Sequence, residues 1–173
     1  MFFFDCFFVY LQGSIIKTKN MANTYSQIYN HFVFAVKNRE NIILESWKDE
    51  LYKYITGIIT KQGCKLISIG GAEDHVHLLV GMSTEVSPAR IMMEVKRSST
   101  KWINERRFVR GHFLWQEGYG VFSYSRSAIN KVASYIENQE IHHKKKSFLE
   151  EYLKILRDFD VDYDERYIFR PID

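Results

Sequence analysis

The hydrophobic and polar positions of this chain change their period several times, and each change marks a predicted element. Short runs rich in β-branched and aromatic residues are typical of strands, and they occur at 25–36, 65–69, 75–80 and 113–125. Apolar residues spaced three and four apart are typical of helices, and they occur at 47–62, 88–107, 127–141 and 148–158. Gly70-Gly71 predicts the turn of a hairpin between the second and third strands, and Ser127 is the predicted N-cap of the third helix.

The resulting order is strand, helix, strand, strand, helix, strand, followed by two further helices. This order predicts an α+β protein with the ferredoxin-like split βαβ arrangement. We expect an antiparallel sheet with helices on one face, plus the C-terminal helices. Sheets of this kind carry many functions, so the fold alone does not identify an activity.

A length of 173 residues suffices for one domain with a substantial core and barely for two. The opening segment is apolar, but it is too short to span a bilayer and Asp5 interrupts it. We therefore expect residues 1–20 to be an N-terminal extension outside the domain, and residues 21–173 to form a single domain.

The composition is compatible with a nucleic-acid partner without requiring one. The net charge is only +3, whereas the aromatic content of 16% favours β-structure and supplies rings that can stack on bases. Cys6 and Cys64 are far apart and lack the spacing of a zinc site or a disulfide framework, so we expect a reducing, cytoplasmic setting.

Two histidines separated by one apolar residue, His75 and His77, lie inside the third predicted strand. Because side chains alternate along a strand, both imidazoles must project from the same face. Two neighbouring imidazoles provide half of a metal site. Taken alone, such a pair is more often structural than metal-binding, so the other half must come from elsewhere in the chain.

Tyr135 and Gln139 are four residues apart in the predicted helix 127–141 and would share one helical face. A phenol can attack a phosphodiester covalently, and an amide oxygen can complete the coordination of a divalent ion. Taken alone, a tyrosine at helical spacing is usually a core or boundary residue, and glutamines are common on the surfaces of helices.

Four blocks of the chain together resemble the single-tyrosine HUH transposases of the simplest bacterial insertion sequences, a group that includes TnpA-like and REP-associated tyrosine transposases. The blocks are 25–39, 74–80, 115–123 and 135–143, in the family's order. The chain departs from the family pattern at Tyr124, a second phenol near the predicted site, and in its N-terminal extension.

The resemblance implies a DNA transposase that cleaves and rejoins single-stranded DNA at the ends of an insertion sequence. His75, His77 and Gln139 would hold Mg²⁺ or Mn²⁺, and Tyr135 would form a 5′-phosphotyrosine intermediate. The DNA would carry hairpin ends, and no nucleotide would be consumed. The family also implies a homodimer with shared active sites, in the bacterial cytoplasm and associated with the nucleoid.

Basic side chains near these blocks are candidates for contacts with phosphate groups of DNA. The alternative is that they form an ordinary solvated surface with no role in binding. The candidate DNA-binding residues are Lys37, Arg39, Lys96, Arg97, Lys101, Arg106, Arg107 and His143.

Two other functions remain open from the sequence. The same sheet could serve a non-catalytic nucleic-acid-binding module, which would need no metal and would form no covalent adduct. A domesticated HUH nuclease would keep the chemistry but act on chromosomal repeats.

Overall fold

The computed structural model describes residues 25–139, 147–164 and 168. The predicted extension, residues 1–20, and the DNA-binding candidate His143 lie outside these residues. The division into an extension and a domain therefore stays a prediction.

The described residues form four strands and four helices in the predicted order. The strands are β1 Tyr29–Ala35, β2 Lys65–Ala72, β3 His75–Gly81 and β4 Gly120–Tyr124. The helices are α1 Glu45–Lys61, α2 Pro88–Arg106, α3 Ile129–Glu137 and α5 Phe148–Asp158. Two short 3-10 helices, η1 Lys37–Arg39 and η2 Arg126–Ala128, follow β1 and β4.

The strands form one antiparallel sheet in the order β2-β3-β1-β4. Because β3 lies between β2 and β1, the unit β1-α1-β2 is split by a third strand, which confirms the ferredoxin-like α+β prediction. Strand β1 is central and pairs with β3 on one side and with β4 on the other.

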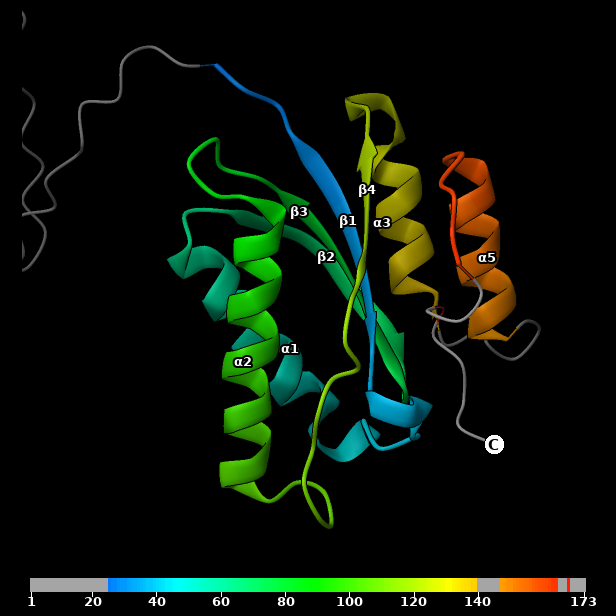
Figure 1. Ribbon diagram of the computed structural model, residues 1–173. Helices are drawn as coiled ribbons and strands as arrows, with labels where there is room; N and C mark the ends of the chain where they lie inside the picture. Colours follow the sequence, from blue (N-terminus) through cyan, green and yellow to red (C-terminus); the bar gives the residue numbers. More distant parts are fainter. Residues whose placement is uncertain (1–24, 140–146, 165–167, 169–173) are drawn as a thin grey trace, which may run out of the picture.

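Helices cover both faces of this sheet, as Figure 1 shows. Helices α1 and α2 pack on one face, and α3 and α5 pack on the other. The C-terminal helices therefore form a third layer, because the strands of the sheet are apolar on both faces and each face must be covered.

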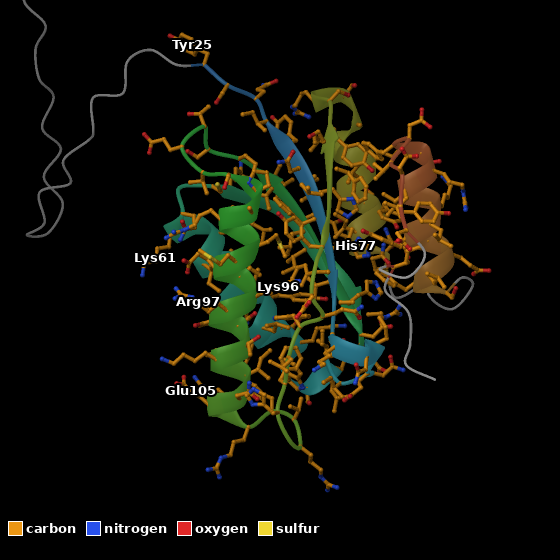
Figure 2. The ribbon with its side chains drawn as sticks, in the orientation of Figure 1. Tyr25, Lys61, His77, Lys96, Arg97 and Glu105 are labelled. Atoms are coloured by element: carbon orange, nitrogen blue, oxygen red, sulfur yellow. The ribbon has the colours of Figure 1, made fainter. Side chains whose placement is uncertain are left out.

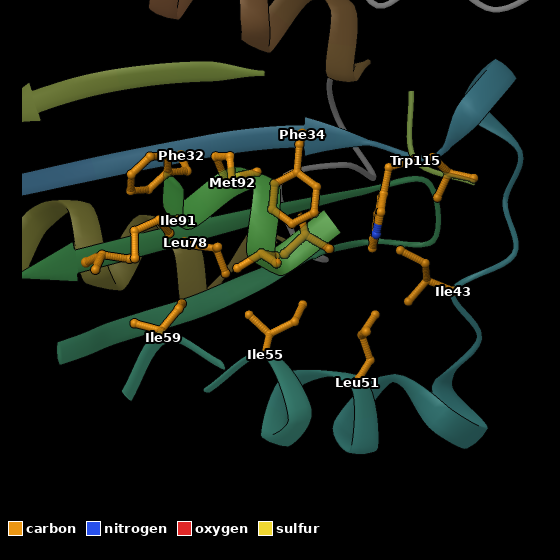
Figure 3. Close-up of a cluster of buried hydrophobic side chains, with 14 of the residues drawn as sticks. Phe32, Phe34, Ile43, Leu51, Ile55, Ile59, Leu78, Ile91, Met92 and Trp115 are labelled. Carbon is orange, nitrogen blue, oxygen red and sulfur yellow. The ribbon is translucent and has the colours of Figure 1, made fainter. Parts of the chain in front are cut away.

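The larger core lies between the sheet and helices α1 and α2, as Figure 3 shows. Phe32, Phe34 and Leu78 project from the sheet into this core and are fully buried. Burying each such side chain contributes about 1.5–3 kcal/mol. The alternation of β3 sends Val76, Leu78 and Val80 to this side, which leaves His75 and His77 for the opposite face.

The hairpin turn between β2 and β3 differs from the sequence prediction. Gly70 and Gly71 lie inside β2, and the chain reverses at Glu73 and Asp74. Gly70 serves a packing role instead, because a Cβ built there would lie 2.1 Å from the backbone oxygen of Ile136. The missing side chain lets the backbone of α3 lie directly on the sheet.

Two other predicted boundaries were wrong. The last strand covers only Gly120–Tyr124, because residues 113–119 are mostly irregular, although Phe113 and Trp115 are buried in the larger core. Ser127 lies within η2, so it does not cap the third helix; Ala128 occupies the N-cap position of α3. The helix predicted over 88–107 and the helix predicted over 148–158 agree closely with α2 and α5.

No helix within the described residues is both long enough and apolar enough to cross a bilayer.

Candidate active site

His75 and His77 project from β3 toward α3 and α5, where their rings lie near Tyr135 and Phe148, and both are fully buried. Figure 2 labels His77 between the sheet and this helical layer. We call this side of the sheet, which carries His31, His75 and His77, the histidine face. The two imidazole rings lie edge to face with their centroids 5.0 Å apart, as the strand alternation predicted.

His75 is fixed by a chain of polar contacts that begins at the end of β1. Its Nδ1 donates a hydrogen bond to Oδ1 of Asp74, 2.6 Å away, and Arg39 forms an ion pair with the other oxygen of that carboxylate. The Arg39 guanidinium also lies over the Phe148 ring, 4.2 Å from its centroid. A carboxylate on Nδ1 sets the tautomer of a histidine and leaves Nε2 as the coordinating atom.

His77 is held by a third histidine, His31, which the sequence analysis did not single out. His31 lies on the adjacent strand β1, and its Nε2 lies 2.8 Å from Nδ1 of His77. The two rings stack with a centroid distance of 5.1 Å. The sequence indicates the role of His31 only weakly, because one histidine in an apolar strand resembles an ordinary core residue. In both His75 and His77, Nδ1 is therefore hydrogen-bonded, to Asp74 and to His31 respectively, and Nε2 lies on the other side of the ring.

Tyr135 lies on α3 beside the same histidines. Its ring centroid is 6.0 Å from that of His77 and 6.4 Å from that of His31, in an edge-on arrangement in both cases. The close approach of α3 to Gly70 and a bond from the Ser68 hydroxyl to the Ala133 carbonyl hold the helix there. The predicted nucleophile therefore lies beside His77 of its own chain.

Gln139 also lies at this site, but, contrary to the sequence prediction, it does not belong to the same regular helix as Tyr135. Helix α3 ends at Glu137, so Gln139 lies beyond it and does not share a regular helical face with Tyr135. Its side chain is nevertheless buried, and Nε2 donates to Oε1 of Glu151 over 2.8 Å. It also interacts with His75.

Glu151 is a second site residue that the sequence analysis missed. It lies on α5, where Ser147 and Glu150 form a capping box, and its Oε1 is 3.5 Å from Nε2 of His77. A signal was present in the helical pattern, because Glu151 falls on the apolar stripe that contains Phe148, Tyr152 and Ile155. A carboxylate on the buried side of an amphipathic helix requires a partner and indicates a special role.

The donor set fits a divalent cation. One candidate ligand atom each from His75, His77 and Glu151 lies within 4.8 Å of the others. Donors on opposite sides of an octahedral Mg²⁺ are about 4 Å apart, so small adjustments would bring these atoms around one ion. Imidazole nitrogen and carboxylate oxygen are ligands that Mn²⁺ also accepts.

The pKa values of the surrounding groups follow from their burial and neighbours. Burial lowers the pKa of His31 to about 4 and also lowers that of His75. Burial and the nearby Asp74 charge raise the pKa of Glu151 to about 7. Burial alone would raise the pKa of Asp74, but His75 and Arg39 outweigh it and lower that pKa to about 2.

Tyr124, the additional phenol, lies on the same face. Its ring centroid is 6.1 Å from that of His31, and it packs against Phe159. Burial, with a smaller contribution from Asp158, raises the pKa of Tyr124. Ring distances alone therefore do not identify which of the two phenols, Tyr135 or Tyr124, is the nucleophile.

The candidate DNA-binding residues of α2 and its C-cap lie away from the histidines. Helix α2 lies on the opposite face of the sheet from His77, as Figure 2 shows with Arg97 and Glu105 labelled. Arg97 pairs with Glu94, Lys101 pairs with Glu105, and Arg106 lies over the Trp102 ring. Lys96 donates to the backbone oxygens of Gln116 and Gly118, and Arg107 forms the C-cap of α2.

The two candidates at the end of β1 differ from each other. Arg39 is nearly buried between Asp74 and Phe148, which gives it a role in positioning His75. Lys37 is exposed beside it and is accessible to a phosphate group.

Known transposases are similar to this chain in sequence and in fold. The ISDra2 transposase TnpA of Deinococcus radiodurans is 25% identical over 122 residues, which cover 65% of this chain and 84% of that protein.

Two solved structures share the fold. One, from Deinococcus radiodurans R1, is classed as a transposase; it has a TM-score of 0.55 and 23% identity, and the match covers 70% of this chain and 97% of that chain. The other is a REP-associated tyrosine transposase bound to a REP hairpin, with a TM-score of 0.55, 13% identity and coverage of 72% and 73%.

The family described as "Transposase IS200 like" matches residues 24–139, a segment that contains His31, both HUH histidines, Tyr135 and Gln139. Because this match extends over more than half of the sequence, the chain belongs to the family of IS200-like transposases.

Proposed function

We propose that this transposase cleaves and rejoins single-stranded DNA through a covalent bond between Tyr135 and a 5′ phosphate. The observation that carries the proposal is the meeting of Tyr135, the histidine pair and Gln139 on one face of the sheet within a single chain. These groups come from β3, α3 and the segment after α3, which are far apart in the sequence.

The chemistry follows from the character of these groups. The phenolic oxygen of Tyr135 forms a bond to phosphorus while the bond from phosphorus to the 3′ oxygen breaks. The phenol loses a proton and the departing 3′ oxygen gains one, so the step is neutral in protons. The 5′ phosphate stays on the protein, and a 3′-hydroxyl can later reverse the reaction and join a different strand.

His75, His77 and Gln139 are the residues that would hold Mg²⁺ or Mn²⁺ in this reaction. When bound, the ion supplies Lewis-acid stabilisation of the charge that develops on the scissile phosphate. The protein groups orient the site: Asp74 and His31 fix the two imidazoles, and α5 shields the ligands from bulk water.

The DNA partner is inferred from the relatives. The REP-associated tyrosine transposase with the same fold is bound to a hairpin, which supports hairpin-forming single strands as the substrate here. We also propose a homodimer, as the family resemblance implies. A domesticated enzyme acting on chromosomal repeats would use the same residues, and the DNA flanking the gene distinguishes it from a mobile element.

The test is the capture of a covalent adduct. Single-stranded oligonucleotides from the DNA flanking the gene are incubated with the protein and Mn²⁺, and a protein–DNA species is sought on a denaturing gel. We expect an adduct with the unaltered protein and none with Tyr135→Phe. His75→Ala should lose cleavage while hairpin binding is largely retained.

Tyr124→Phe is the matched control, because it removes the other phenol near His31. It should still form the adduct. An adduct that survives Tyr135→Phe but disappears in Tyr124→Phe would assign the nucleophile to Tyr124. Binding without any adduct would support the non-catalytic module instead.

A further inference from the structure

We propose that Glu151 of α5 is the anionic ligand of the divalent-metal site, acting together with His75 and His77. The proposal rests on the proposed function and names a ligand from a helix that lies outside the segment matched by the family. The helix after the tyrosine would then be part of the metal site as well as part of the fold.

The first argument is geometric. Oε1 of Glu151 is 3.5 Å from Nε2 of His77, and the cluster of candidate ligand atoms also includes His75. The Nδ1 atoms of both histidines are engaged, by Asp74 and by His31. The coordinating Nε2 of His77 therefore faces the carboxylate of α5.

The second argument concerns charge. His75 and His77 are fully buried, and neutral imidazoles with an amide oxygen would leave a divalent ion with no compensating charge. The nearby Asp74 carboxylate is already paired with Arg39. Glu151 is the member of this cluster whose side chain can supply a negative charge, and a carboxylate is a preferred ligand of Mg²⁺ and Mn²⁺.

The third argument explains the position of Gln139. Its Nε2 donates to Oε1 of Glu151, so the amide fixes the orientation of the carboxylate. The same amide still has its oxygen, which can serve as a ligand in its own right. Glu151 and Gln139 thus form a coupled pair at the site, and the proposal does not remove Gln139 from it.

Metal binding to the full-length chain tests the proposal without relying on catalysis. Isothermal titration with MnCl₂ compares the unaltered protein with Glu151→Gln, which keeps an oxygen that can accept the bond from Gln139. We expect the Kd for Mn²⁺ to rise by at least about 10-fold, since even outer-shell substitutions cost about 10–100-fold. The Mn²⁺-dependent rise in Tm should shrink in parallel.

Glu150→Gln is the matched control, because it makes the same change one residue earlier on the exposed side of α5. Glutamine can still complete the capping box with Ser147, so helix α5 should be preserved. This variant should bind Mn²⁺ as the unaltered protein does. If Glu151→Gln fails to fold, Glu151→Asp keeps the charge on a shorter side chain, and it should show intermediate affinity.

Unchanged Mn²⁺ affinity in Glu151→Gln or in Glu151→Asp would overturn the ligand assignment, as would the absence of Mn²⁺ binding by the unaltered protein. The adduct assay separates this failure from failure of the proposed function. An adduct formed normally by Glu151→Gln would reject only the role of Glu151, whereas no adduct with the unaltered protein would reject the proposed chemistry.

Discussion

His31 shows how one buried side chain can organise a neighbouring functional group. Burial lowers its pKa to about 4, so the ring is neutral near pH 7 and its Nε2 can accept the Nδ1 proton of His77. With the proton of that bond on Nδ1 of His77, the lone pair of His77 lies on Nε2, on the side of Glu151. His31 is therefore a positioning residue, and its contribution should appear in the metal affinity.

We predict that His31→Phe, which keeps a ring but removes the acceptor, raises the Kd for Mn²⁺ by about 10-fold. His31→Gln should recover part of the affinity, because its amide oxygen can accept the same proton. Titration calorimetry measures both variants, with circular dichroism to verify the fold. Equal affinities for His31→Phe and the unaltered protein would show that His31 only fills space.

At the scale of elements, Lys96 connects α2 to the segment that precedes β4. Its ammonium donates to the backbone oxygen of Gln116 over 2.7 Å and also to that of Gly118. Burial lowers the pKa of Lys96 to about 8. This lysine therefore anchors an irregular segment, and its contact with a phosphate group stays a prediction.

This lowered pKa predicts a dependence of stability on pH. Between about pH 8 and pH 10.5 the unfolded chain holds a proton on Lys96 that the folded chain has released, so folding gains stability as the pH rises. The stability of the unaltered protein relative to Lys96→Met should increase with pH over this range. Urea unfolding at the two ends of that window, about pH 8 and about pH 10.5, measures this change.

Lys101→Met serves as the control for this prediction, because Lys101 is an exposed lysine of the same helix. If the stability of the unaltered protein relative to Lys101→Met rose with pH as it does relative to Lys96→Met, the effect would not come from the buried position of Lys96.

At the scale of the molecule, the sheet separates two layers with different tasks. The histidine face with α3 and α5 holds the candidate chemistry, and the opposite layer holds the larger core and the basic helix α2. A DNA strand bound at the histidines would have to pass around the sheet to contact α2 of the same chain. Alternatively, the same DNA strand could contact α2 of a second copy of the protein.

Because Tyr135 already lies beside His77 of its own chain, we predict that two inactive variants do not complement each other. Tyr135→Phe and His75→Ala, mixed and re-equilibrated, should give no adduct with the oligonucleotide. A restored adduct would instead show that a homodimer exchanges the tyrosine helix, as the family resemblance implies. Equilibrium sedimentation of the mixture would establish whether the two chains associate.

The sequence by itself determined the elements and the direction of the key side chains. Strand alternation placed His75 and His77 on one face, and helical periodicity located α2 and α5 almost to the residue. These features depend on neighbours along the chain, which is why a pattern in the sequence could predict them. The four motif blocks and their order along the chain were enough to indicate the family that the comparisons then identified.

Only the tertiary structure decided which distant residues meet. His31 from β1, Glu151 from α5 and Arg39 from η1 reach the site through strand register and helix packing, and no local pattern in the sequence predicts which site residue each of them contacts. Gly70 illustrates the reason: its sequence context favours a turn, yet the contact with α3 places it inside a strand. The local sequence pattern predicts whether a segment is a helix or a strand, whereas close packing between segments determines which segments contact each other.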